Sequence, residues 1–246
     1  MELASLPNGL ELYTESPTEA EYLYKEMYEH GCYDSISLPD DPFVLDVGAN
    51  IGMFSLYTKQ RYPKARIMAF EPIPVTRGIL ERNIALHGLT DIQVEGHALG
   101  AETEADVVFT HYPRLPGNST RYPEQKQLQI DVCLRLYPDD DTIEQHQGYE
   151  VTVPVDRLSR RLPADTRVDL LKVDVEGAEY EVLLGIDPED WARIDRIILE
   201  VQDLDGRLDR INGFLAGKGY RTETMPSPMV EEEILTFLVT AVREGL

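Results

Sequence analysis

From residue 43 onward the chain alternates between short apolar runs and segments whose apolar residues recur at helical spacing. The runs at 43–47 and 66–70 predict buried strands, and residues 91–96 predict a third strand. The segments between them, 51–61 and 74–87, predict helices, the second with Pro74 at its first position. Strands separated by helices are typical of a parallel sheet in an α/β protein.

The same alternation continues in the second half of the chain. It predicts strands at 151–155, 168–173 and 196–201, helices at 177–185 and 207–217, and a final pair of strands near 219–224 and 234–241. The final pair has the pattern of an antiparallel hairpin. The expected fold class is therefore α/β, with a mostly parallel sheet that ends in an antiparallel C-terminal strand pair.

Two regions lie outside this alternation. Near the N-terminus, Ser16 begins a capping box, and the helix it starts should run to about Glu29. Between residues 101 and 150, ADVVFTH predicts a strand, YPRLPGNSTRYPEQKQ a loop and LQIDVCLRLY an ordered segment, before the exposed acidic link PDDDTIEQHQG. We expect one domain over 1–246, with a helical cap at 1–42 and an inserted substrate or lid region at 101–150.

Composition narrows the class of protein. The net charge of −22 argues against partners that are nucleic acids or anionic membranes, since both would be repelled. No apolar run reaches the roughly 20 residues of a membrane span, and no signal peptide is evident. Cys32 and Cys133 form neither a disulfide framework nor a metal cluster, so a cytoplasmic location is expected. The scattered acids predict a well-solvated surface, with attraction of a cationic substrate as the alternative.

The stretch VLDVGANIG joins the first expected strand of the sheet to a helix through a glycine-rich turn. It has the form D-x-G-x-N-x-G at Asp46, Gly48, Asn50 and Gly52. Such a turn brings backbone N–H groups close to a nucleotide-like ligand. A dinucleotide fingerprint would need glycine at positions 50 and 53, where this chain has Asn50 and Met53. The spacing therefore disfavours an NAD-linked dehydrogenase.

Carboxylates follow four of the expected strands. They are Asp46, Glu71, Asp174 with Glu176, and Glu200 with Asp203. Ligands of open α/β sheets bind outside the carboxyl ends of the strands, so these side chains should border one site. Glu71 is placed to accept hydrogen bonds from ribose hydroxyls, and Pro72 keeps the chain extended after it. The alternative is a local role, with Asp46 capping a turn and Asp174 or Glu176 capping a helix.

Taken together, several blocks resemble the FkbM family of methyltransferases from the first helix to Tyr220. They are TEAEYLYKEMYEHGCY, VLDVGANIGMFSLY, AFEPIP, LPGNST, DLLKVDVEGAE and DWARIDRIILEVQDLDGRL. The resemblance is strongest to members associated with polyketide and nonribosomal peptide assembly. It implies a class I methyltransferase sheet and S-adenosyl-L-methionine (SAM) as methyl donor. It also implies a hydroxyl acceptor on a natural product or sugar, free or tethered to a carrier protein.

With SAM as the expected cofactor, the motifs receive roles. The residues expected to bind it are Asp46, Gly48, Ala49, Asn50, Gly52, Glu71 and Pro72, with His97 and Ala98 beside the adenine. The acceptor is expected to meet Asn118 and Ser119, which offer neutral hydrogen bonds, while Tyr24 and Tyr28 of the first helix cover the cleft.

One position departs from the family pattern and leaves the catalytic base open. Relatives commonly carry Glu-x-His where this chain has Glu200-Val201-Gln202, and an amide cannot take up the acceptor proton. The remaining candidates are His111, Asp174 and Asp203. In a metal-assisted alternative, Asp174 and Glu200 bind Mg²⁺ and a diol, with a third oxygen from Gln202 or Glu176. A further alternative is a SAM-binding module that has lost catalysis.

Overall fold

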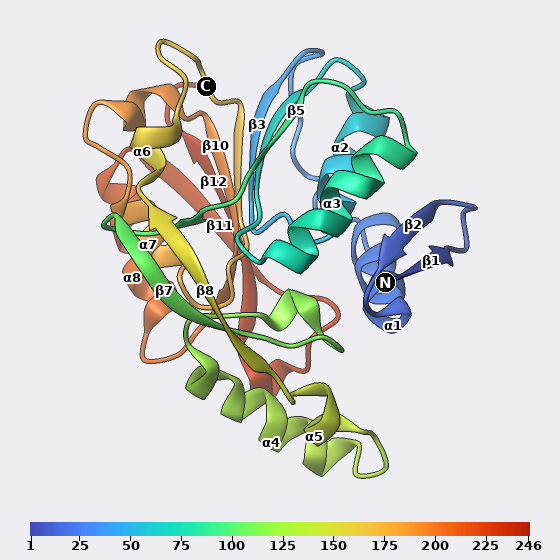
Figure 1. Ribbon diagram of the computed structural model, residues 1–246. Helices are drawn as coiled ribbons and strands as arrows, with labels where there is room; N and C mark the ends of the chain where they lie inside the picture. The colour runs from blue at the N-terminus through green and yellow to red at the C-terminus, as the bar shows by residue number, and fades with distance from the viewer.

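A seven-stranded sheet forms the centre of the computed structural model, which describes all 246 residues (Figure 1). Its strands, in spatial order, are β11 (Tyr220–Pro226), β12 (Thr236–Arg243), β10 (Arg196–Gln202), β9 (Leu170–Val173), β3 (Phe43–Val47), β4 (Arg66–Phe70) and β5 (Ile92–Glu95). The strands from β5 to β10 are parallel, whereas β12 runs antiparallel to both β10 and β11. The predicted antiparallel C-terminal pair is confirmed.

Helices cover both faces of this sheet because side chains alternate between the faces along each strand. On β3, Val44 belongs to one hydrophobic core with α2 (Met53–Arg61) and α3 (Pro74–Leu86). Its neighbour Leu45 belongs to a second core with α7 (Glu179–Leu184) and α8 (Arg207–Gly217). The order of the strands reverses between β3 and β9, which is where an open α/β sheet binds its ligand.

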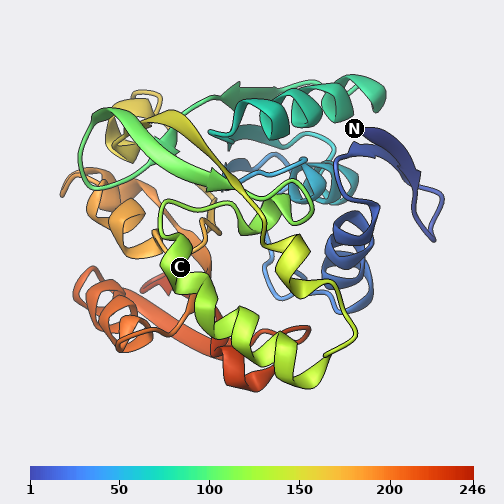
Figure 2. The ribbon, with the colours of Figure 1, turned by 60° about the horizontal axis from the view of Figure 1, so that its bottom comes forward.

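Two further units lie toward the carboxyl ends of the sheet strands. The N-terminal unit holds the hairpin β1 (Glu2–Ser5) and β2 (Glu11–Thr14), then α1 (Pro17–Tyr24) and a π-helical turn over Lys25–Glu29. The second unit is a small sheet of β6 (Ala98–Leu99), β8 (Tyr149–Asp156) and β7 (Glu104–His111), with helices α4 (Gln127–Leu136) and α5 (Thr142–Gln145). Figure 2 shows α4 crossing in front of the sheet on this side.

The remaining elements are short. They are α6 (Leu158–Arg161) and the 3₁₀ turns Pro116–Asn118, Pro123–Lys126, Asp190–Arg193 and Glu232–Ile234. None of the helices is long and apolar enough to span a membrane.

The predicted fold class is confirmed, while several boundaries differ from the expected ones. The strand expected from residue 168 begins at Leu170, and the helix expected from 177 begins at Glu179. The first helix does continue to Glu29, but as a π-helical turn after Tyr24. The hairpin β1–β2 was not expected, and the stretch expected only to be ordered forms helix α4.

Candidate active site

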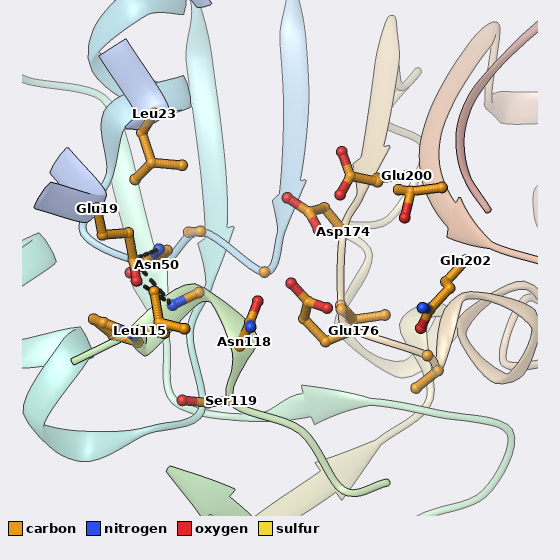
Figure 3. A pocket seen from close by; sticks show the side chains of 18 of the residues that line it. Glu19, Leu23, Asn50, Leu115, Asn118, Ser119, Asp174, Glu176, Glu200 and Gln202 are labelled. Atoms are coloured by element: carbon orange, nitrogen blue, oxygen red, sulfur yellow. Dashed lines mark hydrogen bonds between the residues drawn. The ribbon is translucent and has the colours of Figure 1, made fainter. Parts of the chain in front are cut away.

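A cavity of about 440 Å³ lies where β3, β4, β9 and β10 end. Its wall is completed by α1 on one side and by residues 115–119 of the inserted region on another (Figure 3). Eight carboxyl side chains line it, namely Glu19, Glu26, Glu71, Asp174, Glu176, Glu179, Glu200 and Glu231. The lining cations are Lys126, Lys172 and Arg121. Carboxyl groups therefore outnumber cationic side chains in the cavity.

The glycine turn after β3 lines the cavity and packs against the end of β9. Gly48 has φ +79°, and a Cβ added there would lie 1.8 Å from the backbone oxygen of Asp174. Only glycine fits this close approach. Lys172 Nζ donates to the Gly48 carbonyl at 2.7 Å. The turn and Asp174 are thus held together, and Gly48, Ala49 and Asn50 all line the cavity.

Glu71 lies at the end of β4 with only 6% of its surface exposed. Its two carboxylate oxygens accept hydrogen bonds from the backbone N–H groups of Asn50 and Ile73, both at 2.9 Å. Burial raises the pKa of Glu71 to about 7, even though these hydrogen bonds and the charge of Lys172 oppose the rise. Each oxygen keeps a further lone pair for a ligand hydroxyl.

Lys172 is a buried cation between two carboxylates. Its Nζ lies 3.4 Å from Asp46 on one side and 3.4 Å from Asp174 on the other. Burial alone would lower the pKa of Lys172, but the charges of Asp174 and Asp46 outweigh it and raise that pKa. Asp46 is fully buried, accepts from Ser55 Oγ at 2.8 Å and does not line the cavity. Asp46 therefore supports the turn from behind.

Glu200 lies opposite Asp174 at the end of β10 and forms no hydrogen bond or ion pair (Figure 3). Burial, followed by the charge of Asp174, raises the pKa of Glu200 well above its ordinary value. Two close carboxyl groups cannot both stay charged at low cost, and this favours the protonated form of Glu200. Gln202 also lines the cavity and donates to the Ile234 carbonyl at 3.1 Å.

Most of the other residues predicted to bind the cofactor line the same cavity. Pro72, His97 and Ala98 lie in its wall, and His97 Nε2 accepts from Arg161 at 2.8 Å. Burial and then the charge of Arg161 lower the pKa of His97, so this ring is neutral at pH 7. Gly52 does not line the cavity; with φ +90° it starts helix α2 beneath the turn.

The inserted region is held to both the first helix and the glycine turn by Glu19. Its carboxylate accepts from Asn50 Nδ2 at 2.9 Å and from the Gly117 backbone N–H at 3.0 Å (Figure 3). Asn118 and Ser119, the predicted acceptor-binding residues, line the cavity beside this contact. The sequence indicated Glu19 only as part of a capping box, so its position in the site was missed.

Two predictions about the cavity wall need correction. His111 is fully buried between Ser119 Oγ at 3.0 Å and Glu15 at 3.3 Å, and it does not reach the cavity. Tyr24 and Tyr28 do not line the cavity either. Their rings stack at 5.1 Å between centroids, and the Tyr28 hydroxyl donates to Gln60 of α2. These two rings therefore lie on the side of the helix that faces α2.

A different face of the same helix meets the cavity. The side chains that line it are Thr18, Glu19, Tyr22, Leu23, Glu26 and Met27, at spacings of three and four residues. This spacing was visible in the sequence, but glutamates within a helix read as solvent-exposed until their neighbours are known. No group of three or more His, Cys, Asp or Glu side chains is arranged to hold a metal ion, Asp174 and Glu200 included.

Comparisons with known proteins agree with this arrangement. Residues 46–222 match the model of the methyltransferase FkbM domain, a span that includes the glycine turn, Glu71, Asp174 and Glu200. The chain belongs to the FkbM methyltransferase family. As a member of this family it is an enzyme that transfers methyl groups, and its sheet is that of a class I methyltransferase.

Two relatives are similar to this chain along almost their whole length. Methyltransferase 1 of Beauveria bassiana is 39% identical over 228 residues, which cover 92% of this chain and 90% of the relative. The 31-O-demethyl-FK506 methyltransferase FkbM of Streptomyces tacrolimicus is 31% identical, with coverage of 93% and 92%. The crystal structure of an FkbM methyltransferase from Methylobacillus flagellatus shares the fold, with a TM-score of 0.58 and 15% identity over 92% of this chain and 51% of that chain.

Proposed function

We propose that this enzyme uses SAM to methylate a hydroxyl group of a natural-product or sugar-like acceptor, free or bound to a carrier protein. The observation that carries the proposal is the convergence of the glycine turn, Glu71 and the Asp174–Glu200 pair on one cavity. The name of the Streptomyces relative, which specifies a 31-O position, supports oxygen as the methyl acceptor.

The residues of the cavity fit SAM by chemistry. Its sulfonium cation suits a wall in which carboxyl groups outnumber cationic side chains. Gly48, Ala49 and Asn50 would contact the methionine part, and Glu71 the ribose hydroxyls. His97 and Ala98 would flank the adenine. When bound, SAM would supply an electrophilic methyl group, and the side chains of the cavity would position the acceptor and take up its proton.

The chain's contribution is to hold the acceptor oxygen in line with the donor methyl, exclude water and take up one proton. Positioning can supply roughly 7–11 kcal/mol of the barrier reduction. A general base adds about 10²–10⁴-fold. Asp174 and Glu200 form the polar floor on which the acceptor hydroxyl would rest, because their side chains lie next to one another at the ends of adjacent strands (Figure 3).

The proposal is tested with SAM carrying a trideuterated methyl group and a panel of free and carrier-bound hydroxy compounds. Mass spectrometry should show a gain of one deuterated methyl per product, matched by an equal amount of S-adenosylhomocysteine. The matching panel with amine and thiol groups in place of the hydroxyl tests the acceptor atom. Methylation of the amines or thiols alone would overturn the O-methyltransferase assignment, and no SAM binding at all would overturn the cofactor.

Glu71→Ala is expected to weaken SAM binding by about 1–3 kcal/mol, since two ribose hydroxyls would lose their acceptor. Calorimetric titration measures this directly. Because Glu71 also binds two backbone N–H groups, thermal unfolding of the ligand-free variant is needed to separate local collapse from lost affinity. Unchanged SAM affinity in a folded variant would contradict the ribose assignment.

Asn118→Ala is expected to raise the KM for the acceptor about 5- to 20-fold, with little change in kcat or in SAM affinity. Asn118 lines the cavity on the inserted region, where its amide nitrogen donates to Gln129 at 3.2 Å and its oxygen stays free for a hydroxyl. Steady-state kinetics with the acceptor from the panel checks the result. An unchanged KM would mean that residues 111–128 of the inserted region have a structural role and do not bind the acceptor.

A further inference from the structure

We propose that Glu26, on the N-terminal unit, is the catalytic base that takes the proton from the acceptor hydroxyl; this inference rests on the proposed O-methyl transfer. Chain position gives no hint of this role, because Glu26 precedes the glycine turn and lies outside the sheet. The role follows from where the fold places its side chain.

Glu26 is a buried carboxyl group without a partner. Only 7% of the residue is exposed, yet its side chain forms no hydrogen bond or ion pair and lines the cavity. A buried carboxylate without a partner is costly, so a site that retains one calls for a ligand or proton at that point. Glu26 lies within the π-helical turn Lys25–Glu29, and such turns are frequent at functional sites.

Glu26 lines the same cavity as Asp174 and Glu200, the two residues of the polar floor. Burial, then the charge of Asp174, raises the pKa of Glu26 to about 7, and Lys172 opposes the rise. Glu26 in turn raises the pKa of Glu200. Glu26, Asp174 and Glu200 therefore interact as one group around the polar floor, and the group is completed by Glu176 and Lys172.

The neighbouring candidates are less suited to take up the proton. His111 does not reach the cavity, and Gln202 has no titratable proton. Burial and the charges of the neighbouring carboxylates favour the protonated form of Glu200, which suits it to donate a hydrogen bond to the acceptor. Asp174 is already engaged in an ion pair with Lys172, whose Nζ lies 3.4 Å from its carboxylate. Glu26 has no cation in ion-pair contact.

The proton and electron balance of the step is complete. The acceptor O–H bond breaks and its proton passes to a Glu26 carboxylate oxygen, while the acceptor oxygen forms a bond to the methyl carbon. The donor C–S bond breaks and its electron pair remains on sulfur. One positive and one negative charge are neutralised together, which suits a buried site. Glu26 then releases its proton to water when the product leaves.

Glu26→Gln tests the role, with Glu29→Gln as a matched control in the same π-helical turn but on the exposed surface. With the acceptor identified from the panel, kcat/KM of Glu26→Gln should fall about 10²–10⁴-fold. Its pH–rate profile should lose the acidic limb near pH 7. Glu29→Gln should match the unsubstituted enzyme, and Glu26→Asp should recover an acidic limb at reduced rate. A Glu26→Gln profile that keeps its acidic limb would overturn the proposal.

SAM and S-adenosylhomocysteine provide a test that needs no acceptor. In the unsubstituted enzyme, calorimetry should show the preference for the cationic SAM over its neutral product rising between pH 6 and pH 8, as Glu26 ionises. In Glu26→Gln, the preference for SAM over S-adenosylhomocysteine should rise about tenfold less over the same pH range. Equal pH dependence in both proteins would contradict a charge of Glu26 beside the methyl. Failure of the unsubstituted enzyme to bind SAM would instead overturn the proposed function.

Discussion

Replacing Asp174 with asparagine is expected to abolish detectable methyl transfer, a loss of about 10³-fold or more, while SAM still binds. Asp174 is the carboxylate of the polar floor that is ion-paired with Lys172, and asparagine replaces it with a neutral group of the same shape. The glycine turn should survive, because Lys172 keeps its contacts with Asp46 and with the Gly48 carbonyl. Stopped assays of S-adenosylhomocysteine formation, together with calorimetric titration of SAM, check both halves of the expectation.

A control for this substitution lies at the end of the next strand. Asp203 follows β10 and accepts from the Leu208 backbone N–H at 3.0 Å, at the start of α8. Asparagine serves equally well in that position, so Asp203→Asn should retain activity. Full activity in Asp174→Asn would remove this residue from the reaction. If Asp174→Asn keeps a residual rate, its acidic limb should persist, because the proton goes to Glu26.

The sheet and the cofactor side of the site were predictable because their signals are local. Every residue of Phe43–Val47 is buried, and all but Asp46 are apolar, so the strand appears in the sequence as an apolar run, as central parallel strands do. The turn after it needs glycine for a steric reason that no neighbour can relieve. The carboxyl ends of parallel strands share one edge of the sheet, so the sequence alone predicts that Glu71, Asp174 and Glu200 lie close together.

The acceptor side was harder to predict because it depends on contacts between distant segments. Glu19 lies on α1 and Glu26 on the π-helical turn that follows it, and which face of this helix meets the cavity depends on how it docks against α2. His111 ends a strand whose position beside Glu15 only the fold reveals. The hairpin β1–β2 had a turn signal in Pro7-Asn8-Gly9, yet its strands are only four residues long.

The stability of the ligand-free protein should fall as pH rises from about 5 to 8, the opposite of the usual carboxylate trend. Four glutamates carry the effect, each with a pKa raised by burial to about 7: Glu19, Glu26, Glu71 and Glu179. A carboxyl whose pKa is higher in the folded than in the unfolded state binds its proton more tightly when folded. The contribution of such a carboxyl group to the free energy of unfolding is fully present below pH 4.5 and is lost as the pH rises through about 7.

The expected size of this effect is large for a protein of 246 residues. A rise from 4.5 to about 7 corresponds to at most about 3 kcal/mol per group. The four groups share one cavity and interact, so the sum falls short of four independent contributions. We therefore expect the free energy of unfolding to drop by several kcal/mol between pH 5.5 and pH 8, which urea titrations at fixed ionic strength would measure.

Single substitutions show which residues cause this fall in the free energy of unfolding with pH. Glu26→Gln should be more stable than the unsubstituted protein at pH 8 and equal to it near pH 5, because glutamine imitates the protonated carboxyl at every pH. Glu21→Gln, an exposed change on the same helix, should leave the curve unchanged. Stability that stays flat or rises from pH 5.5 to 8 would mean that these carboxyls are solvated in the ligand-free enzyme. The cavity would then be open to water, and Glu26 would be a solvated carboxyl group and not a buried base.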